Sequence, residues 1–374
     1  MKFNQWTLGL AAVGAVSLAS AVRADEAKLS QLNTALSNTT ISGYVDVAAQ
    51  WNLGNAVAGG TQPFGIAGSK IDAFSANDVV ISLDKPQDES PWASGYHIDL
   101  NWGTDAIGAP VRQAYVALRT PVGNGIDWKL GVIDGITGYE GNTSYQNPNY
   151  SRSYGYQVNP ATYTGLLGNY KVASWISVQA GIANRGATFT GALPVGQTSA
   201  GLSSKDYIAS VSLTAPDSWG FLKGSVLNLQ TVQGFDNGAV NNYSVNGTFN
   251  TPVAGLKLGL SYDAVQSLTQ VNGVSWPFGP NPDLSWDGNI YGVYASYQAT
   301  DKLGLNLRYE YVDLSGTIAG APNLEEITAT LQYDLWANVV SRLEARWDTS
   351  EHYNIFYGNR NNNVLLAANV VYKF

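Results

Sequence analysis

Residues 303–311 read Leu-Gly-Leu-Asn-Leu-Arg-Tyr-Glu-Tyr, with Leu or Tyr at every odd-numbered position and Gly, Asn, Arg or Glu at every even-numbered one. Successive side chains of a β-strand point to opposite faces, so this alternation predicts a strand with one oily face and one wet face. Residues 342–348 (Arg-Leu-Glu-Ala-Arg-Trp-Asp) repeat the alternation with four charges on a single face. Four charges on one face suit a water-filled interior better than a packed core.

The composition points to the same architecture. Charged residues make up 13% of the 374 residues, about half of the usual share in soluble globular proteins. The mean hydropathy is nevertheless close to neutral. Strands that alternate between lipid-facing and lumen-facing positions combine these two properties, so the composition predicts an all-β transmembrane antiparallel β-barrel.

Period-two alternation predicts sixteen strands, a number favoured over fourteen or eighteen. Short links follow the even-numbered strands and long connections follow several odd-numbered ones, as in barrels with short periplasmic turns and long outer loops. A miscounted strand would break this alternation of link lengths. A barrel of this width leaves an aqueous channel. The expected strands span residues 40–51, 76–85, 92–104, 110–120, 126–134, 161–173, 175–185, 204–215, 219–231, 239–251, 256–267, 287–299, 303–315, 323–335, 338–350 and 364–374.

The two ends of the chain predict export and insertion. Residues 1–24 combine Lys2, an apolar stretch and small residues before a cleavage point, which is the pattern of a secretory signal peptide. Residues 25–38 then form a short periplasmic or lumenal segment, and residues 39–374 form the outer-membrane barrel. The last five residues alternate and end in Phe374, which resembles the terminal signal that the barrel-assembly machinery recognises.

Charge and residue usage argue against several other functions. The net charge of -8 argues against nucleic acid as a partner, because phosphate binding needs a basic face. The chain has no Cys and only two His, so we expect no metal site, no cofactor and no enzymatic activity.

Several short motifs resemble the OmpL-like putative β-barrel porin family of bacterial outer-membrane proteins. The resemblance covers nearly all of the chain after the signal peptide, and it implies an outer-membrane porin without implying a particular solute. Many relatives carry a longer helical segment at the N-terminus than residues 25–38 provide. The motifs that carry the resemblance are residues 41–46, 81–86, 113–116, 138–140, 149–153, 307–310 and 342–348.

The function of a passive pore is set by its constriction, where side chains and a loop narrow the lumen. Residues 135–160 are long and rich in Gly, Asn and Tyr, and resemblance to sixteen-stranded porins implies that a loop in this place folds into the lumen. The charges of the opposing wall either create a transverse field across the pore or neutralise one another. The constriction candidates are Asp134, Glu140 and Arg152 at the loop, and Arg119, Lys129, Arg308, Glu310, Arg342, Glu344, Arg346 and Asp348 on the wall.

The sequence therefore predicts a porin in the bacterial outer membrane that lets small hydrophilic solutes or ions diffuse passively. Its expected partners are outer-membrane lipid, the barrel-assembly machinery, the solutes and, by analogy with other sixteen-stranded porins, two further copies in a homotrimer. Two other interpretations remain open. One is a secreted, soluble, β-rich carbohydrate-binding protein, and the other is a barrel with a blocked lumen that acts as an adhesin or a structural protein.

Overall fold

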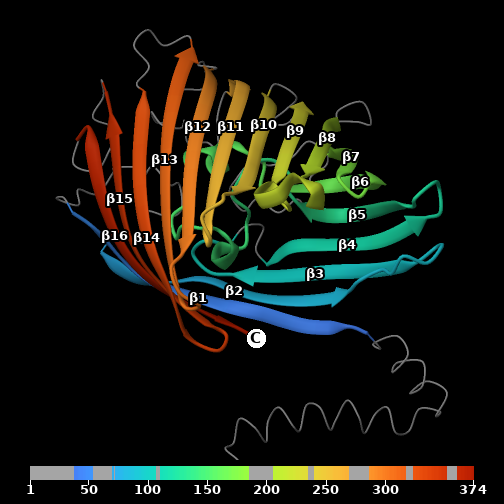
Figure 1. Ribbon diagram of the computed structural model, residues 1–374, viewed down its shortest axis with the longest axis horizontal. Coiled ribbons are helices and arrows are strands. Elements are labelled where there is room, and N and C mark those ends of the chain that lie inside the picture. Colours follow the sequence, from blue (N-terminus) through green and yellow to red (C-terminus); the bar gives the residue numbers. More distant parts are fainter. Residues whose placement is uncertain are drawn as a thin grey trace, which may run out of the picture. The chain divides into compact units, whose positions relative to one another are not determined.

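Sixteen antiparallel β-strands join in chain order into one closed barrel (Figure 1), which confirms the predicted fold class and strand number. The computed structural model describes residues 38–53, 70, 72–106, 110–184, 205–234, 240–268, 286–316, 323–351 and 360–374. The predicted signal peptide (1–24) and nearly all of the predicted segment 25–38 lie outside the described residues.

Fifteen of the sixteen strands begin and end within three residues of the predicted bounds. The alternation of apolar and polar residues is strong enough in these segments to define both ends. The strands are β1 (Thr40–Asn52), β2 (Ala73–Lys85), β3 (Ser94–Trp102), β4 (Val111–Thr120), β5 (Ile126–Asp134), β6 (Thr162–Ala173), β7 (Ile176–Asn184), β8 (Lys205–Thr214), β9 (Val226–Gly234), β10 (Val240–Asn250), β11 (Leu256–Leu268), β12 (Trp286–Gln298), β13 (Leu303–Gly316), β14 (Leu324–Trp336), β15 (Val339–Ser350) and β16 (Asn362–Lys373).

The two faces of the barrel wall have opposite character. On β13, Leu307 is 53% exposed, whereas its neighbour Arg308 is 1% exposed. The same contrast runs along β15, where Leu343 is exposed and Glu344 is buried. Exposed apolar side chains therefore cover the outside, as a lipid-facing surface requires, and the polar side chains point inward.

The first and last strands close the ring. Gly43 and Phe374 exchange backbone hydrogen bonds of 3.0 Å in both directions, and the pairing continues from Tyr44–Lys373 to Asn52–Leu365. A side chain at position 43 would overlap the Val80 carbonyl and lie 2.7 Å from the Phe374 ring. The seam therefore needs glycine at this position because no space remains for a Cβ atom.

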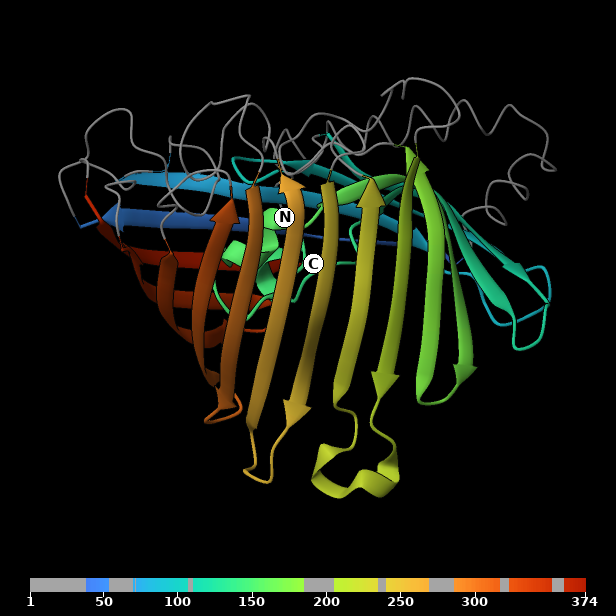
Figure 2. The same ribbon diagram turned by 90° about the horizontal axis from the view of Figure 1, so that it is seen from above.

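The predicted ninth strand is wrong in its bounds. Residues 219–231 were the expected strand, but β9 is Val226–Gly234, and residues Asp217–Leu222 form the 3-10 helix η3. Gly220 has a φ of 59° and interrupts any extended run there. Trp219 and Phe221 are both exposed, so the apolar residues on two faces reflect a turn and not a strand. Figure 2 shows η3 beyond the ends of β8 and β9.

Apart from η3 and Lys70, which has 3-10 conformation, helical structure in the described chain is confined to the connection between β5 and β6. This connection contains the 3-10 helix η2 (Ser144–Gln146) and the five-residue helix α3 (Tyr154–Val158). No helix among the described residues is long and apolar enough to cross a membrane.

Candidate functional site

The β5–β6 segment, residues 135–161, makes hydrogen bonds with inward-facing side chains of several distant strands. Figures 1 and 2 show α3 with strands on every side of it. The N-cap residue of α3 is Ser153, whose hydroxyl accepts a 2.9 Å hydrogen bond from the Tyr156 backbone N–H. This capping explains why the chain forms a helix here despite the short length of α3.

Glu310 of β13 binds the first turn of α3. Its Oε2 accepts from the Tyr154 backbone N–H at 2.6 Å, and its Oε1 accepts from the Gly155 backbone N–H at 3.1 Å. The first N–H groups of a helix have no partner within the helix, so a carboxylate placed there satisfies two of them and complements the helix dipole. A Cβ at position 155 would lie 2.7 Å from Asp263 Oδ2, so glycine permits this close approach.

Glu344 of β15 binds the same segment in the same way. Its two carboxylate oxygens accept from the backbone N–H groups of Tyr150, at 2.6 Å, and Ser151, at 2.9 Å. Thr330 of β14 donates a further hydrogen bond of 2.6 Å to this carboxylate. Glu310 and Glu344 thus hold two pairs of consecutive N–H groups, and each hydrogen bond is strengthened by the negative charge.

Arg308 links the β5–β6 segment to the wall through its guanidinium group. It lies 2.6 Å from Glu140 of the segment and 2.5 Å from Glu326 of β14, and it donates to the Ser151 carbonyl at 2.8 Å. The side chains of Arg308, Glu140 and Glu326 are fully buried. Removing one member would leave a buried charge with fewer partners in a site closed to water.

Two further arginines of β15 bind backbone carbonyls of the segment. Arg346 donates to the Arg152 carbonyl at 2.5 Å and pairs with Asp348 at 2.7 Å. Arg342 donates to the carbonyls of Ser144, at 3.2 Å, and Asn149, at 3.4 Å. The Arg342 side chain is also buried, so the arginine charges of this wall are used to hold the segment.

The structure thus brings together eight of the eleven predicted site residues, and all of them are buried. We call this group the clamp: Glu140, Arg152, Arg308, Glu310, Arg342, Glu344, Arg346 and Asp348.

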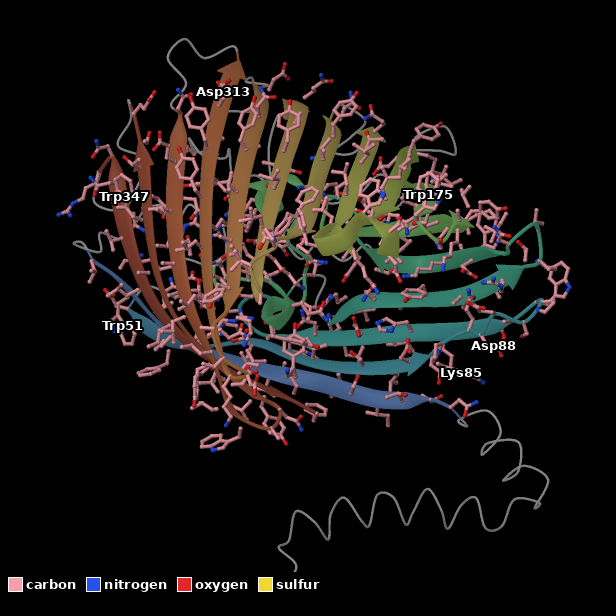
Figure 3. All side chains as sticks on the ribbon, in the orientation of Figure 1. Trp51, Lys85, Asp88, Trp175, Asp313 and Trp347 are labelled. Carbon is pink, nitrogen blue, oxygen red and sulfur yellow. The ribbon has the colours of Figure 1, made fainter. Side chains whose placement is uncertain are left out.

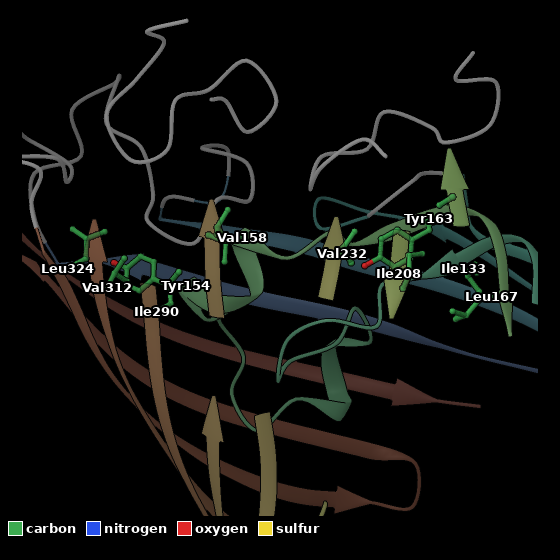
Figure 4. Packing of buried hydrophobic residues seen from close by; sticks show 12 residues of the cluster. Ile133, Tyr154, Val158, Tyr163, Leu167, Ile208, Val232, Ile290, Val312 and Leu324 are labelled. Atoms are coloured by element: carbon green, nitrogen blue, oxygen red, sulfur yellow. The ribbon is translucent and has the colours of Figure 1, made fainter. Parts of the chain in front are cut away.

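Aromatic packing supports the clamp on both sides. The Tyr139 ring stacks on Tyr294 of β12 with the ring centroids 4.0 Å apart, and Gly259 of β11 leaves room for the Tyr139 hydroxyl. Tyr154 packs in a buried cluster with Ile290 and Leu324 (Figure 4). Burial raises the pKa of the Tyr154 phenol well above its usual value, so this side chain stays neutral.

The other three predicted residues lie on the opposite wall. Asp134 pairs with Arg112 at 2.5 Å, and Arg119 pairs with Asp127 at 2.5 Å. The Lys129 ammonium lies 4.7 Å from the centroid of the Tyr115 ring, and Lys129 is exposed. These residues belong to β4 and β5, five to eight strand positions away from β13–β15 in the ring of sixteen, and they are separate from the clamp.

Sequence reasoning missed three residues that matter here. Arg112 faces inward because the pairing of β3 with β4 shifts at Asp99 and Leu100, and regular alternation would place it outward. Glu326 lies at an inward-facing position in the alternation of β14, but this strand has few other charges that would have drawn attention to it. Asp46 of β1 accepts from Ser144 of the segment at 2.6 Å, and only its place in an alternating strand could have indicated an inward position.

In the described part of the chain, no group of three His, Asp or Glu side chains is arranged to hold a metal ion.

Comparisons with known proteins agree with this geometry. Residues 38–374 match the model of a family described as Putative beta-barrel porin-2, OmpL-like. None of the curated protein sequences that were compared matches the chain.

Solved structures of several bacterial outer-membrane proteins share the fold. The outer membrane channel DcaP of Acinetobacter baumannii has a TM-score of 0.61 at 12% identity, covering 90% of this chain and 97% of its own. An anion-selective porin from Comamonas acidovorans has a TM-score of 0.57 at 12% identity, covering 90% and 99%. The outer membrane protein OmpT of Vibrio cholerae has a TM-score of 0.56 at 12% identity, covering 90% and 97%.

Proposed function

Because the chain belongs to the OmpL-like family of putative β-barrel porins, we propose that it is an outer-membrane porin through which small hydrophilic solutes diffuse passively. The closed barrel with an apolar outside and a polar inside supports this function. The exposed apolar outer surface argues against the soluble carbohydrate-binding alternative, since water would have to cover that surface. A passive pore needs neither a cofactor nor catalysis, and we propose neither.

We propose further that the β5–β6 segment narrows the interior. The observation that carries this proposal is the pair of carboxylates Glu310 and Glu344, each of which accepts two consecutive backbone N–H groups of the segment. Such contacts hold backbone at a fixed distance from the wall and not merely near it. The clamp then fixes the position of the segment inside the barrel.

In this proposal the charged residues of β13–β15 hold the β5–β6 segment in place and do not line the aqueous passage. The Arg308–Glu326 and Arg346–Asp348 pairs are buried, and their opposite charges lie within hydrogen-bond distance, so these charges contribute little to the field in an aqueous passage. Ion selectivity would then depend on the wall formed by β3–β6, where Lys129 is exposed.

Orientation, export and assembly complete the proposal. We propose that the end with the short turns, including Ala337–Asn338, faces the periplasm, and that residues 1–24 are removed after export. The barrel would be inserted by the barrel-assembly machinery into outer-membrane lipid. A homotrimer is our proposal for the assembly, by analogy with other sixteen-stranded porins.

Conductance measurement tests the proposed function. The folded mature chain, reconstituted in a planar lipid bilayer, should give discrete and stable current steps in KCl. Heat-modifiable migration on a gel would establish that the protein is folded. Silence from demonstrably folded protein would reject the porin and favour the barrel with a blocked lumen.

A further inference from the structure

A cavity of about 520 Å³ lies at the short-turn end of the barrel, between β2 and β7. Its lining includes Asp127 and Lys129 of β5, Asn169 of β6 and Gln179 of β7, together with Gln87 of the β2–β3 turn. Figure 3 labels Lys85 and Asp88 at this end, on either side of Gln87 in sequence. No residue of the β5–β6 segment lines the cavity, so it is separate from the clamp.

Lys129 supplies a positive charge that forms no ion pair with a described carboxylate, although Asp84, Asp88, Glu89 and Asp127 also line the cavity. The two arginines on the same wall, Arg112 and Arg119, each pair with an aspartate at 2.5 Å. Lys129 forms no ion pair with a described residue, and its ammonium lies over the Tyr115 ring instead. Since the lysine is exposed toward the cavity, its charge is available to an anionic group of a solute.

Three amide side chains around the cavity have unused hydrogen-bonding capacity. Gln87 donates to Asp127 at 2.6 Å, but its Oε1 is buried without a hydrogen-bond partner in the described structure. Asn169 and Gln179 lie directly opposite each other on β6 and β7, and neither side chain is bonded to another described residue. An amide both donates and accepts, which suits the recognition of hydroxyl groups.

We propose that this cavity binds a small hydroxylated organic acid on its way through the pore. The carboxylate would bind Lys129, and the hydroxyl groups would bind Asn169, Gln179 and the free Oε1 of Gln87. An inorganic anion would leave the amides unused, and a neutral sugar would leave the lysine unused. The volume of about 520 Å³ lies within the usual range for a small-molecule site. This inference rests on the proposed porin function and adds a solute class to it.

The test uses D-gluconate as the probe and D-glucose as the uncharged comparison. Single-channel current is recorded from the full mature chain at fixed ionic strength while gluconate is added on the short-turn side. We expect a saturable fall in conductance with gluconate and none with glucose. Lys129→Gln should raise the half-saturating concentration about tenfold or more, because a hydrogen bond to a charged group is lost.

Lys257→Gln is the matched control, since Lys257 is also exposed and faces inward near the short-turn end but belongs to β11. It should leave the half-saturating concentration within about twofold of the wild-type value. Asn169→Ala together with Gln179→Ala should weaken gluconate block without removing it, because the lysine remains.

Three results would overturn the inference: equal block of Lys129→Gln and wild type, equal effects of the Lys129 and Lys257 changes, or no saturable block of an open channel. Current steps in KCl report the porin function separately from gluconate block. If folded protein gives no steps, calorimetric titration of gluconate into the detergent-folded protein decides the question. Binding that Lys129→Gln weakens would support the site, and absence of binding would refute it.

Discussion

Arg308 of β13 lies 2.6 Å from Glu140 of the β5–β6 segment, and both side chains are fully buried. The pair joins residues that are 168 positions apart in the chain. Glu326 binds the same guanidinium at 2.5 Å, so the ion pair is part of a network and not an isolated contact. A buried network of this kind is strongly destabilised when one member is lost.

We therefore predict that Arg308→Met lowers the free energy of unfolding by about 3 kcal/mol, because it removes the ion-pair partner of Glu140 and the nearer of the two arginines that bind Glu326. Urea unfolding in detergent, followed by gel mobility, measures this. The double variant that also carries Glu140→Gln should lose less free energy of unfolding than the two single variants together. The difference should be at least about 1 kcal/mol. Strict additivity would show that the two groups do not interact.

Glu310→Gln should make the open channel noisier. The amide replaces one acceptor oxygen with an NH₂ group that faces the Gly155 N–H, so the first turn of α3 is no longer held at both N–H groups. We expect frequent fluctuations of the single-channel current and a higher mean conductance. Glu325→Gln, which changes a carboxylate on the other face of the neighbouring strand, should leave the current unchanged.

Gly259→Ala should displace Tyr139, because an added Cβ would overlap the Tyr139 hydroxyl while the ring is fixed on Tyr294. We expect a loss of about 1–3 kcal/mol in the free energy of unfolding. Tyr139→Phe in the same chain should restore part of it by removing the overlapping oxygen. Gly304→Ala is the control, because the nearest atom to its Cβ would be 3.6 Å away. Equal losses at the two glycines would contradict this explanation.

Alkaline pH should loosen the β5–β6 segment. Burial raises the pKa of Tyr139 above its ordinary value, so the folded state favours the neutral phenol. The stabilisation is complete below the pKa of the unfolded chain, about 10, and is lost as the pH rises through the higher pKa of the folded protein. Gel mobility after incubation between about pH 8 and about pH 12 measures this loss. Tyr139→Phe should retain more stability than wild type at the upper end.

Much of the barrel could be predicted from sequence, because alternation is a local property that survives without knowledge of the partners. Leu307 and Arg308 indicate their faces through their neighbours alone. The start of β9 escaped prediction because Phe221 and Leu222 break the alternation where Gly220 turns the chain. Arg112 escaped because a shift in strand pairing reverses its face, and no local pattern reveals such a shift.

The candidate site was predictable only in part. The inward direction of Arg308, Glu310 and Glu344 follows from alternation, and the structure places all three inward and buried. Their partners are mostly backbone N–H and carbonyl groups of a distant segment. Every residue carries such groups, so they leave no signal in the sequence, and a charge that binds them cannot be told from one that faces water.

The clamp also has a consequence for the order in which the protein assembles. Residues 135–161 are synthesised long before β13–β15, yet four of their N–H groups find carboxylate partners on those late strands. These N–H groups therefore stay hydrated until β13–β15 have been synthesised. The seam, which pairs Gly43 of the first strand with Phe374, also forms late. Ring closure and internal docking are thus late events with high contact order, which makes them slow steps of biogenesis. A chain stalled before β13 would keep contacts such as Ser144–Asp46 but would lack the clamp residues that β13 and β15 supply.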